Sequence, residues 1–317
     1  MSKAKELLAK LQNAKTKELY DEEFLIADGQ TPDGKPIVIV NTDKLSHLNP
    51  EQKMAMVKLL VMKVLSGHSN ALVIMGDAGI GKTFLVEQTL EASGRVWEHE
   101  QREYTDEELD ELVDQPAPSM VMFSGNTTPK GIYKNLYDYR EGWIIVFDDC
   151  DDALIKSPNI MKSALHNGGR RVISWSSARP EKDLPTKFEF KSRVIFISNM
   201  TADQIDPAIR SRCDDLNLVL TRDEAHSYIR KCLPFIQTMR TNDETGERTE
   251  IQLPDKVREE IFDKISTQRH GLAEYSFRTF KKAVECYDFA QEHQKELEEV
   301  DLTWYDLWLD QQDILDV

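Results

Sequence analysis

The hydrophobic positions follow two different periods along the chain. Between residues 50 and 65 apolar side chains recur every three or four residues, which predicts an amphipathic helix. From residue 71 to about 220 they gather in short unbroken runs between helical segments, as in a parallel sheet buried on both faces. The runs predict strands at 71–75, 119–123, 143–147, 171–175, 194–198 and, as a last strand, 216–220.

The regions outside these runs predict a different organisation. Residues 1–35 predict a helix, with Leu7, Leu8 and Leu11 on one face, followed by a turn-rich stretch at 28–34. A short strand is expected at 36–40 and a solvated helix in the acidic insertion 98–114. After Thr221, a plausible helix N-cap, helical signals dominate and a polar loop at 240–250 interrupts them.

These patterns predict an α/β fold with three parts. We expect an N-terminal helix and extension over residues 1–49 and an α/β domain over 50–220. A small all-helical domain with an acidic C-terminal tail is expected over 221–317.

Composition narrows the class of protein. No apolar run of the 317 residues approaches the ~18–20 needed to cross a bilayer, and the N-terminus lacks a signal-peptide pattern, so a cytoplasmic protein is expected. The four cysteines form no CxxC pair, which argues against a zinc site. A net charge of −16 disfavours wrapping duplex DNA on the outer surface, although a local basic channel is compatible with it.

One motif has specific chemistry. The sequence GDAGIGKT at residues 76–83 fits GxxxxGK[ST] between an apolar strand and a helix that begins near Phe84. Glycines allow backbone N–H groups to turn toward phosphates, and the helix N-terminus adds partial positive charge. The motif predicts that Lys82 binds the β- and γ-phosphates of ATP and that the Thr83 hydroxyl binds Mg²⁺. The expected nucleotide ligands are Gly76, Asp77, Ala78, Gly79, Ile80, Gly81, Lys82, Thr83 and Phe84.

A second motif places acids at the end of a strand. The run 143–147 delivers Asp148 and Asp149 at its carboxyl end and resembles a Walker B element. We assign Asp148 to the magnesium shell and Asp149 to polarising the attacking water.

Three further segments, in order along the chain, resemble those of AAA+ ATPases. Asn199 ends a buried strand, where the family has its sensor 1 residue. The segment DPAIRSRC at 206–213 is similar to the clamp-loader Ser-Arg-Cys motif, which implies an arginine finger at Arg212, with Arg210 as second choice. Arg278 matches sensor 2 in the helical domain. The resemblance covers roughly residues 50–290 and implies an oligomeric ring, expected to be a hexamer, with ATP bound where sheet and lid meet.

One departure bears on activity. Most active AAA+ proteins have Asp-Glu at Walker B, whereas this chain has Asp148 followed by Asp149, whose side chain is one methylene shorter. Hydrolysis is therefore less firmly implied than binding. The sequence leading into the sensor 1 strand also looks like AAA+ proteins of tailed bacteriophages.

Three segments are candidates for contact with a client. Lys130 and Tyr133 lie where the family has a pore loop, although a plain turn into a helix fits equally. The stretch 168–193 is locally basic and could line a DNA channel, or its charges could pair with acids across a subunit interface. Trp304 and Trp308 could dock a partner or pack on the lid. The channel residues expected to contact DNA are Arg170, Arg171, Arg179 and Lys182.

Three functions follow from this resemblance. The leading one is a ring ATPase that acts as a motor, loader or remodeller in DNA replication, recombination or packaging. The second is a protein-complex remodeller of the unfoldase type. The third is an ATP-gated scaffold with little hydrolysis, which the Asp149 departure would suit.

Overall fold

The structure is a computed structural model that divides into two compact units, Met1–His47 and Leu48–Val317. The predicted N-terminal helix lies outside the described residues, as does the acidic insertion beyond residue 98. The structure describes residues 24–30, 36–40, 45, 48–98, 119–125, 127–175, 184–242 and 245–315.

The first unit contains an antiparallel pair of strands, β1 (Phe24–Gln30) and β2 (Pro36–Val40). The predicted strand at 36–40 is confirmed as β2. The turn-rich stretch was expected to begin at residue 28, but β1 continues to Gln30, which lies opposite Pro36 of β2 after an irregularity in the register.

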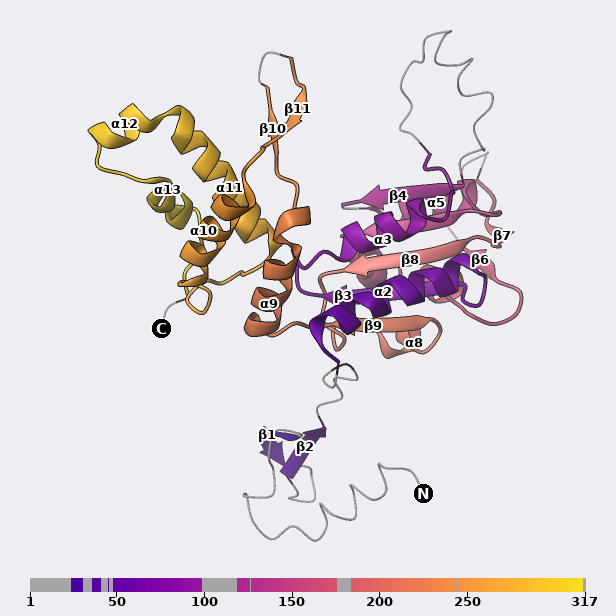
Figure 1. Ribbon diagram of the computed structural model, residues 1–317. Coiled ribbons are helices and arrows are strands. Elements are labelled where there is room, and N and C mark those ends of the chain that lie inside the picture. The colour runs from indigo at the N-terminus through magenta and orange to yellow at the C-terminus, as the bar shows by residue number, and fades with distance from the viewer. Residues whose placement is uncertain are drawn as a thin grey trace. The chain divides into compact units, whose positions relative to one another are not determined.

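The second unit is built on a five-stranded parallel sheet with the order β4-β5-β8-β3-β9 (Figure 1). In its register Val73 lies opposite Phe196 on one side and Asp215 on the other. Five of the six predicted runs form these strands, and the last begins two residues earlier than expected. The strands are β3 (Ala71–Gly76), β4 (Met120–Ser124), β5 (Ile144–Asp148), β8 (Arg193–Ser198) and β9 (Asp214–Leu218).

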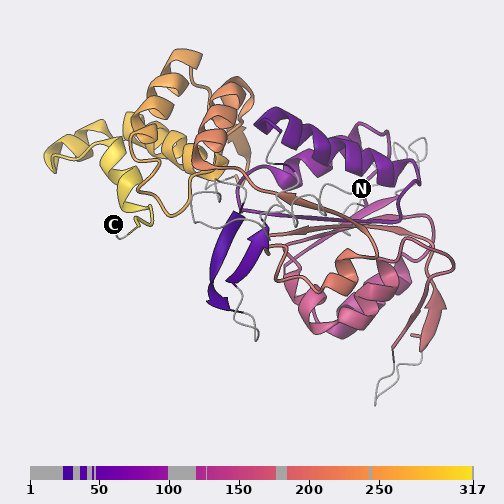
Figure 2. The ribbon, with the colours of Figure 1, turned by 90° about the horizontal axis from the view of Figure 1, so that it is seen from below.

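Helices cover both faces of this sheet (Figure 2). Ala71, Val73 and Met75 pack into a core shared with α5, α6 and α7, so the alternate residues Leu72 and Ile74 face the side of α2 and α3. Burial on both faces explains the unbroken apolar runs. The helices are α2 (Pro50–Leu65), α3 (Lys82–Glu91), α5 (Pro129–Asp138), α6 (Asp151–Lys156), α7 (Pro158–Ala164) and α8 (Pro207–Arg210).

The run at 171–175 does not join the parallel sheet, so this prediction is wrong. It forms β6 (Val172–Ser174), which pairs antiparallel with β7 (Lys187–Glu189). Only Ile173 of the three β6 residues is buried, because a separate hairpin has one face on the core and the other in solvent.

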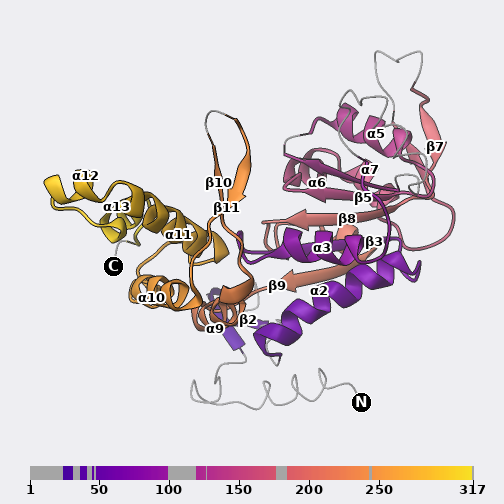
Figure 3. The same cartoon turned by 45° about the horizontal axis from the view of Figure 1, so that its top comes forward.

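The C-terminal part of this unit is a helical lid (Figure 3). Thr221 caps its first helix in a capping box with Glu224, as predicted from Thr221. The predicted polar loop at 240–250 instead contains an antiparallel hairpin. Its Arg240 pairs with Asp288 of α11 at 3.5 Å. The lid elements are α9 (Arg222–Cys232), η2 (Leu233–Phe235), β10 (Met239–Thr241), β11 (Arg248–Glu250), α10 (Asp255–Ser266), α11 (Phe277–Glu292), α12 (Gln294–Glu299) and α13 (Trp304–Asp310).

The aromatic stripe near the C-terminus belongs to the core of the lid. Trp308 is fully buried, and its indole N–H donates to the Thr279 carbonyl of α11 at 3.2 Å. The interpretation of Trp308 as a packing residue is therefore correct, and it is not available for partner docking. No helix of the described residues is both long and apolar enough to cross a bilayer.

Candidate functional site

Three of the parallel strands bring the predicted site residues to one edge of the sheet. β5, β8 and β3 are consecutive neighbours, so their carboxyl ends place Asp148, Asn199 and Gly76 close together. The chain leaves β3 for the far strand β4 and later returns to both sides of β3. Such a switch point at the carboxyl edge is where open α/β sheets bind ligands.

The loop 76–83 connects β3 to α3 with glycines at the positions that other residues cannot occupy. Gly76 has φ 144°, and a Cβ there would lie 2.1 Å from the carbonyl oxygen of Leu218 in β9. Gly81 is the N-cap of α3 and has no side chain, so no capping side chain bonds the first N–H groups of the helix. These donors and the positive end of the helix suit an anion.

Lys82 is only 5% exposed and lies at the centre of the loop. Its ammonium donates to the Gly76 and Asp77 carbonyls, both at 2.7 Å, and to Asn199 Oδ1 at 2.9 Å. Burial lowers the pKa of Lys82, and nearby carboxylates, Asp149 first among them, oppose that shift. Lys82 is therefore a buried cation held by neutral oxygen atoms, which a phosphate can replace.

Thr83 and Asp148 form a pair of oxygen donors beside Lys82. The Thr83 hydroxyl donates to Asp148 Oδ1 at 3.1 Å and to Oδ2 at 3.0 Å. Burial raises the pKa of Asp148, while the hydrogen bond from Thr83 opposes the rise. A hydroxyl and a carboxylate next to a phosphate site fit Mg²⁺, which is held by one or two protein ligands together with phosphate oxygens.

Asp149 follows in an unusual backbone conformation. Its φ is 53°, in the left-handed region, and its N–H donates to the Ile197 carbonyl at 3.2 Å. Asn199 Nδ2 donates to Asp149 Oδ1 at 2.6 Å. The Asn199 amide therefore bridges Lys82 and Asp149, so the predicted phosphate ligand, sensor and water-polarising acid form one hydrogen-bonded chain.

The lid contacts the phosphate loop directly. Phe277 N–H, at the start of α11, donates to the Gly79 carbonyl at 3.1 Å. The segment before it is held by Arg222, which donates to the Leu272 and Ala273 carbonyls at 2.7 Å each. Arg278 is the next residue after Phe277, so the same contact places its side chain at the site.

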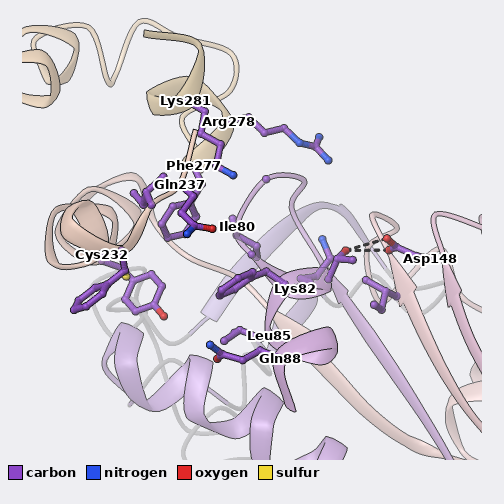
Figure 4. Close-up of a pocket in the computed structure, with 18 of the residues that line it drawn as sticks. Ile80, Lys82, Leu85, Gln88, Asp148, Cys232, Gln237, Phe277, Arg278 and Lys281 are labelled. Atoms are coloured by element: carbon purple, nitrogen blue, oxygen red, sulfur yellow. Dashed lines mark hydrogen bonds between the residues drawn. The ribbon is translucent and has the colours of Figure 1, made fainter. Parts of the chain in front are cut away.

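A cavity of about 740 Å³ lies between the loop and the lid (Figure 4). Its size falls within the roughly 300–1,000 Å³ usual for ligand pockets. Arg278 and Lys281 line it from α11, and Asp148, Asp149 and Asn199 line it from the carboxyl ends of β5 and β8. Of the loop residues predicted to bind nucleotide, Gly79 to Phe84 line the cavity. Gly76, Asp77 and Ala78 are absent from its lining, although the first two hold Lys82.

The contact between Gly79 and the lid predicts the effect of an added methyl group. Gly79 has φ 72°, and a Cβ there would lie 2.5 Å from Ser276 Oγ and 2.8 Å from Glu274 Oε1. Gly94 has φ 73° with nothing within 4 Å, so it is a matched control. Gly79→Ala and Gly94→Ala should each lower the free energy of unfolding by ~1–2 kcal/mol through the left-handed backbone.

Only Gly79→Ala should also weaken nucleotide binding, severalfold, because only this substitution displaces the lid from the loop. Calorimetric titration with ADP and thermal unfolding measure the two effects. Equal ADP affinity of both variants would contradict a lid contact that matters for the site.

The two candidate finger arginines have different surroundings. Arg210 bonds Asp215 through two nitrogens, at 2.8 and 3.0 Å, and the Ala202 carbonyl at 2.9 Å, so it is paired within its own chain. Arg212 donates to the Ala208 carbonyl and forms no ion pair with a described carboxylate. Neither arginine lines the cavity of its own chain.

The segments predicted to grip a client are mostly engaged in internal contacts. Tyr133 is fully buried, and its hydroxyl donates to the Pro185 carbonyl at 2.8 Å, so its assignment as a pore-loop residue is wrong. Thr128 caps α5, which supports the plain turn into a helix. Sequence periodicity alone does not show that Tyr133 faces Phe188 and Trp175 of a distant hairpin.

Several residues of the predicted basic channel also make contacts within the chain. Arg171 is buried, with its guanidinium on the Ala164 and Ser192 carbonyls, so it cannot line a channel. Arg170 pairs with Glu189 at 3.2 Å but remains exposed. Lys191 pairs with Glu141 at 3.5 Å. Arg179 and Lys182 lie outside the described residues.

Sequence reasoning missed the wall of the cavity formed by the start of the lid. Tyr228 and Cys232 of α9 line it, followed by Phe235, Ile236 and Gln237. The capping box at Thr221 predicted the helix that carries the first two, but nothing in the sequence showed that this helix faces the phosphate loop.

Comparisons with known proteins give a family match and a relative. The family model described as an AAA domain (dynein-related subfamily) matches residues 71–213. An uncharacterised 36.7 kDa protein of enterobacteria phage T4, from the nrdC-mobD intergenic region, is 27% identical over 150 residues. That match covers 44% of this chain and 39% of the phage protein. The chain therefore matches well under half the length of this relative.

The solved structures to which the chain is similar share less of its sequence. RuvB of Thermotoga maritima, described as a Holliday junction branch migration motor, has a TM-score of 0.38 at 11% identity, over 76% of this chain and 63% of that chain. The AAA domain of FIGL-1 in complex with ADP has a TM-score of 0.41 at 11% identity, over 90% and 82%. C. elegans PCH-2 has a TM-score of 0.37 at 13% identity, over 75% and 62%.

The family match, the phosphate loop and the parallel sheet with its helical lid define the class of this protein. Residues 71–213 fall in the AAA+ P-loop class, and the chain is similar to a phage protein.

Proposed function

We propose that this protein binds Mg-ATP in the cavity between the loop and the lid and hydrolyses it. The observation that carries this proposal is the chain of hydrogen bonds from Lys82 through Asn199 to Asp149, beside the bonded pair Thr83 and Asp148. These hydrogen bonds support the proposal because they connect a buried ammonium to one carboxylate and join a hydroxyl to a second carboxylate nearby. Hydrolysis of a phosphoanhydride requires these groups together.

Each residue has a separate task in this proposal. The Lys82 ammonium would exchange its carbonyl partners for phosphate oxygens, and Thr83 and Asp148 would hold Mg²⁺. Bound Mg²⁺ supplies neutralisation of the charge on the phosphates. Asp149 orients the attacking water and accepts its proton, and the Asn199 amide keeps this carboxylate in place.

We further propose that the active form is a homo-oligomeric ring, a hexamer, with Arg212 of one subunit serving the cavity of the next. The support is that Arg212 forms no ion pair with a described acid and does not line its own cavity. Arg278 would act within its own chain, since it lines the cavity from the lid. The client we propose is nucleic acid. Arg170, which stays exposed in the basic stretch, is the described residue that supports this choice.

The decisive test is steady-state ATP hydrolysis, with Asp149→Asn as the inactive control. Asparagine tolerates the left-handed backbone of this position but cannot accept a proton, so folding and ATP binding should be unchanged. We expect turnover to fall by ~10²–10⁴. Turnover that equals that of the native protein would show that Asp149 is not the base.

The same assay addresses the client and the scaffold alternative. A rise in turnover with added single- or double-stranded DNA, absent from Asp149→Asn, would support nucleic acid. A rise with a protein partner alone would indicate a protein remodeller. ATP-dependent assembly with negligible turnover would indicate a scaffold, which the short Asp149 side chain would suit.

A further inference from the structure

The sheet and the lid are connected by three residues. β9 ends at Leu218 and α9 begins at Arg222, so residues 219–221 are the covalent junction between the sheet and the lid. A lysine from α2, a helix far away in the sequence, hydrogen-bonds to residues at this junction. Lys53 of α2 donates to the Val219 carbonyl at 3.1 Å and to both carboxylate oxygens of Glu224, each at 3.0 Å.

Lys53 is unusual for a lysine because its side chain is 3% exposed. An ammonium has three N–H donors, and the three oxygen partners given above match that number. One partner precedes the N-cap of α9 and the other two belong to the first turn of α9. Glu224 also accepts the Thr221 N–H at 2.8 Å, so the ammonium and the capping box share one carboxylate.

The helix that carries Lys53, α2, is packed on the sheet. Its neighbours Met54, Val57 and Val61 are buried, and α2 packs on β3, β8 and β9 of the sheet. In this ion pair Lys53 is buried and Glu224 is 25% exposed, so loss of Glu224 would leave a buried ammonium without its carboxylate. The junction is therefore fixed to the sheet through α2 as well as through the main chain.

The consequence reaches the cavity through α9. Tyr228 and Cys232 of this helix line the cavity opposite the phosphate loop. They lie ~6 and ~12 Å along the helix axis from Glu224 at 1.5 Å per residue. A change of angle at the junction therefore moves this wall relative to α3.

We infer that Lys53 is a positioning residue for the nucleotide site: it fixes the lid junction, and through α9 it sets the wall of the cavity. This inference rests on the proposed function for the identity of the ligand. A second ion pair between the same helices, Glu51 with Lys231, is exposed and provides a matched control.

The test compares Lys53→Met with Lys231→Met in the full chain, using ADP as the probe. Methionine keeps the length and apolar stem of Lys53 but removes all three donors. We expect Lys53→Met to weaken ADP binding about 10-fold, within the ~5–150-fold range of coupled sites. Lys231→Met should change ADP affinity less than about twofold, as exposed ion pairs contribute little.

Two further measurements separate positioning from general stability. Amide hydrogen exchange without ligand should accelerate in α9 of Lys53→Met while β3 and β8 stay protected. In a double-mutant cycle, Glu224→Gln combined with Lys53→Met should lose no more ADP affinity than Lys53→Met alone. Unchanged affinity and exchange, or exchange accelerated equally throughout the chain, would overturn the inference. If the native protein does not bind ADP, the proposed function fails, and the exchange measurement still tests the junction.

Discussion

Lys82→Ala should abolish measurable nucleotide binding while the protein stays folded. The ammonium is buried, and phosphate oxygens would replace its present carbonyl and amide partners. Loss of two charge-assisted hydrogen bonds of ~1.5–3 kcal/mol each corresponds to at least about a 100-fold loss of affinity. Calorimetric titration with ATP and Mg²⁺ measures the effect.

Lys281→Ala is the control for this experiment. Lys281 lines the same cavity from the lid, so the substitution changes the net charge equally without touching the loop. We expect a much smaller loss of affinity there. Equal losses in both variants would mean that the cavity attracts the nucleotide through general charge and that Lys82 has no special position.

Arg212→Ala should leave ATP binding near normal and lower hydrolysis by ~10³–10⁵, the range of arginine fingers. Arg212 does not line the cavity of its own chain, so in the proposed ring its loss would act on the site of a neighbouring subunit. The measurement is turnover at saturating ATP, at protein concentrations where the oligomer forms. If Arg212→Ala hydrolyses ATP at the native rate, the finger assignment is wrong.

Arg210→Ala provides the contrast. Its guanidinium is bonded to Asp215 and to the Ala202 carbonyl, so its removal leaves a partly buried carboxylate without its partner. We expect this variant to lose stability, seen as a lower melting temperature. Mixing Arg212→Ala with Lys82→Ala subunits then tests action between subunits, because each mutant retains the part that the other lacks.

The phosphate loop and the central strands were predictable because their signals are local. Gly76 to Thr83 is a contiguous motif whose glycines and lysine have fixed chemical tasks, and buried strands need unbroken apolar runs. Asp148 and Asn199 each follow a strand of the parallel sheet, and the carboxyl ends of such strands meet at one edge. The structure brings these residues together by hydrogen bonds, as the resemblance implied.

What could not be predicted depends on partners distant in sequence. The run at 171–175 has the composition of a central strand, but its pairing with residues 187–189 takes it out of the sheet. Tyr133 suits a pore loop and Arg171 suits a DNA channel by residue type, but tertiary packing buries both side chains. Lys53 reads as an ordinary exposed lysine on an amphipathic helix, because its acceptors lie more than 160 residues away.

The backbone at Asp149 has a consequence for how this position can evolve. With φ at 53°, asparagine and glycine fit the main chain easily but would remove the carboxylate on which the proposed chemistry depends. Glutamate, the usual residue of the family, would restore a longer acid but lacks the short polar side chain that makes left-handed backbone tolerable. Two opposed selection pressures therefore meet at one residue, and aspartate is the side chain that satisfies both. The left-handed backbone at this position therefore favours aspartate over the glutamate that is usual in the family.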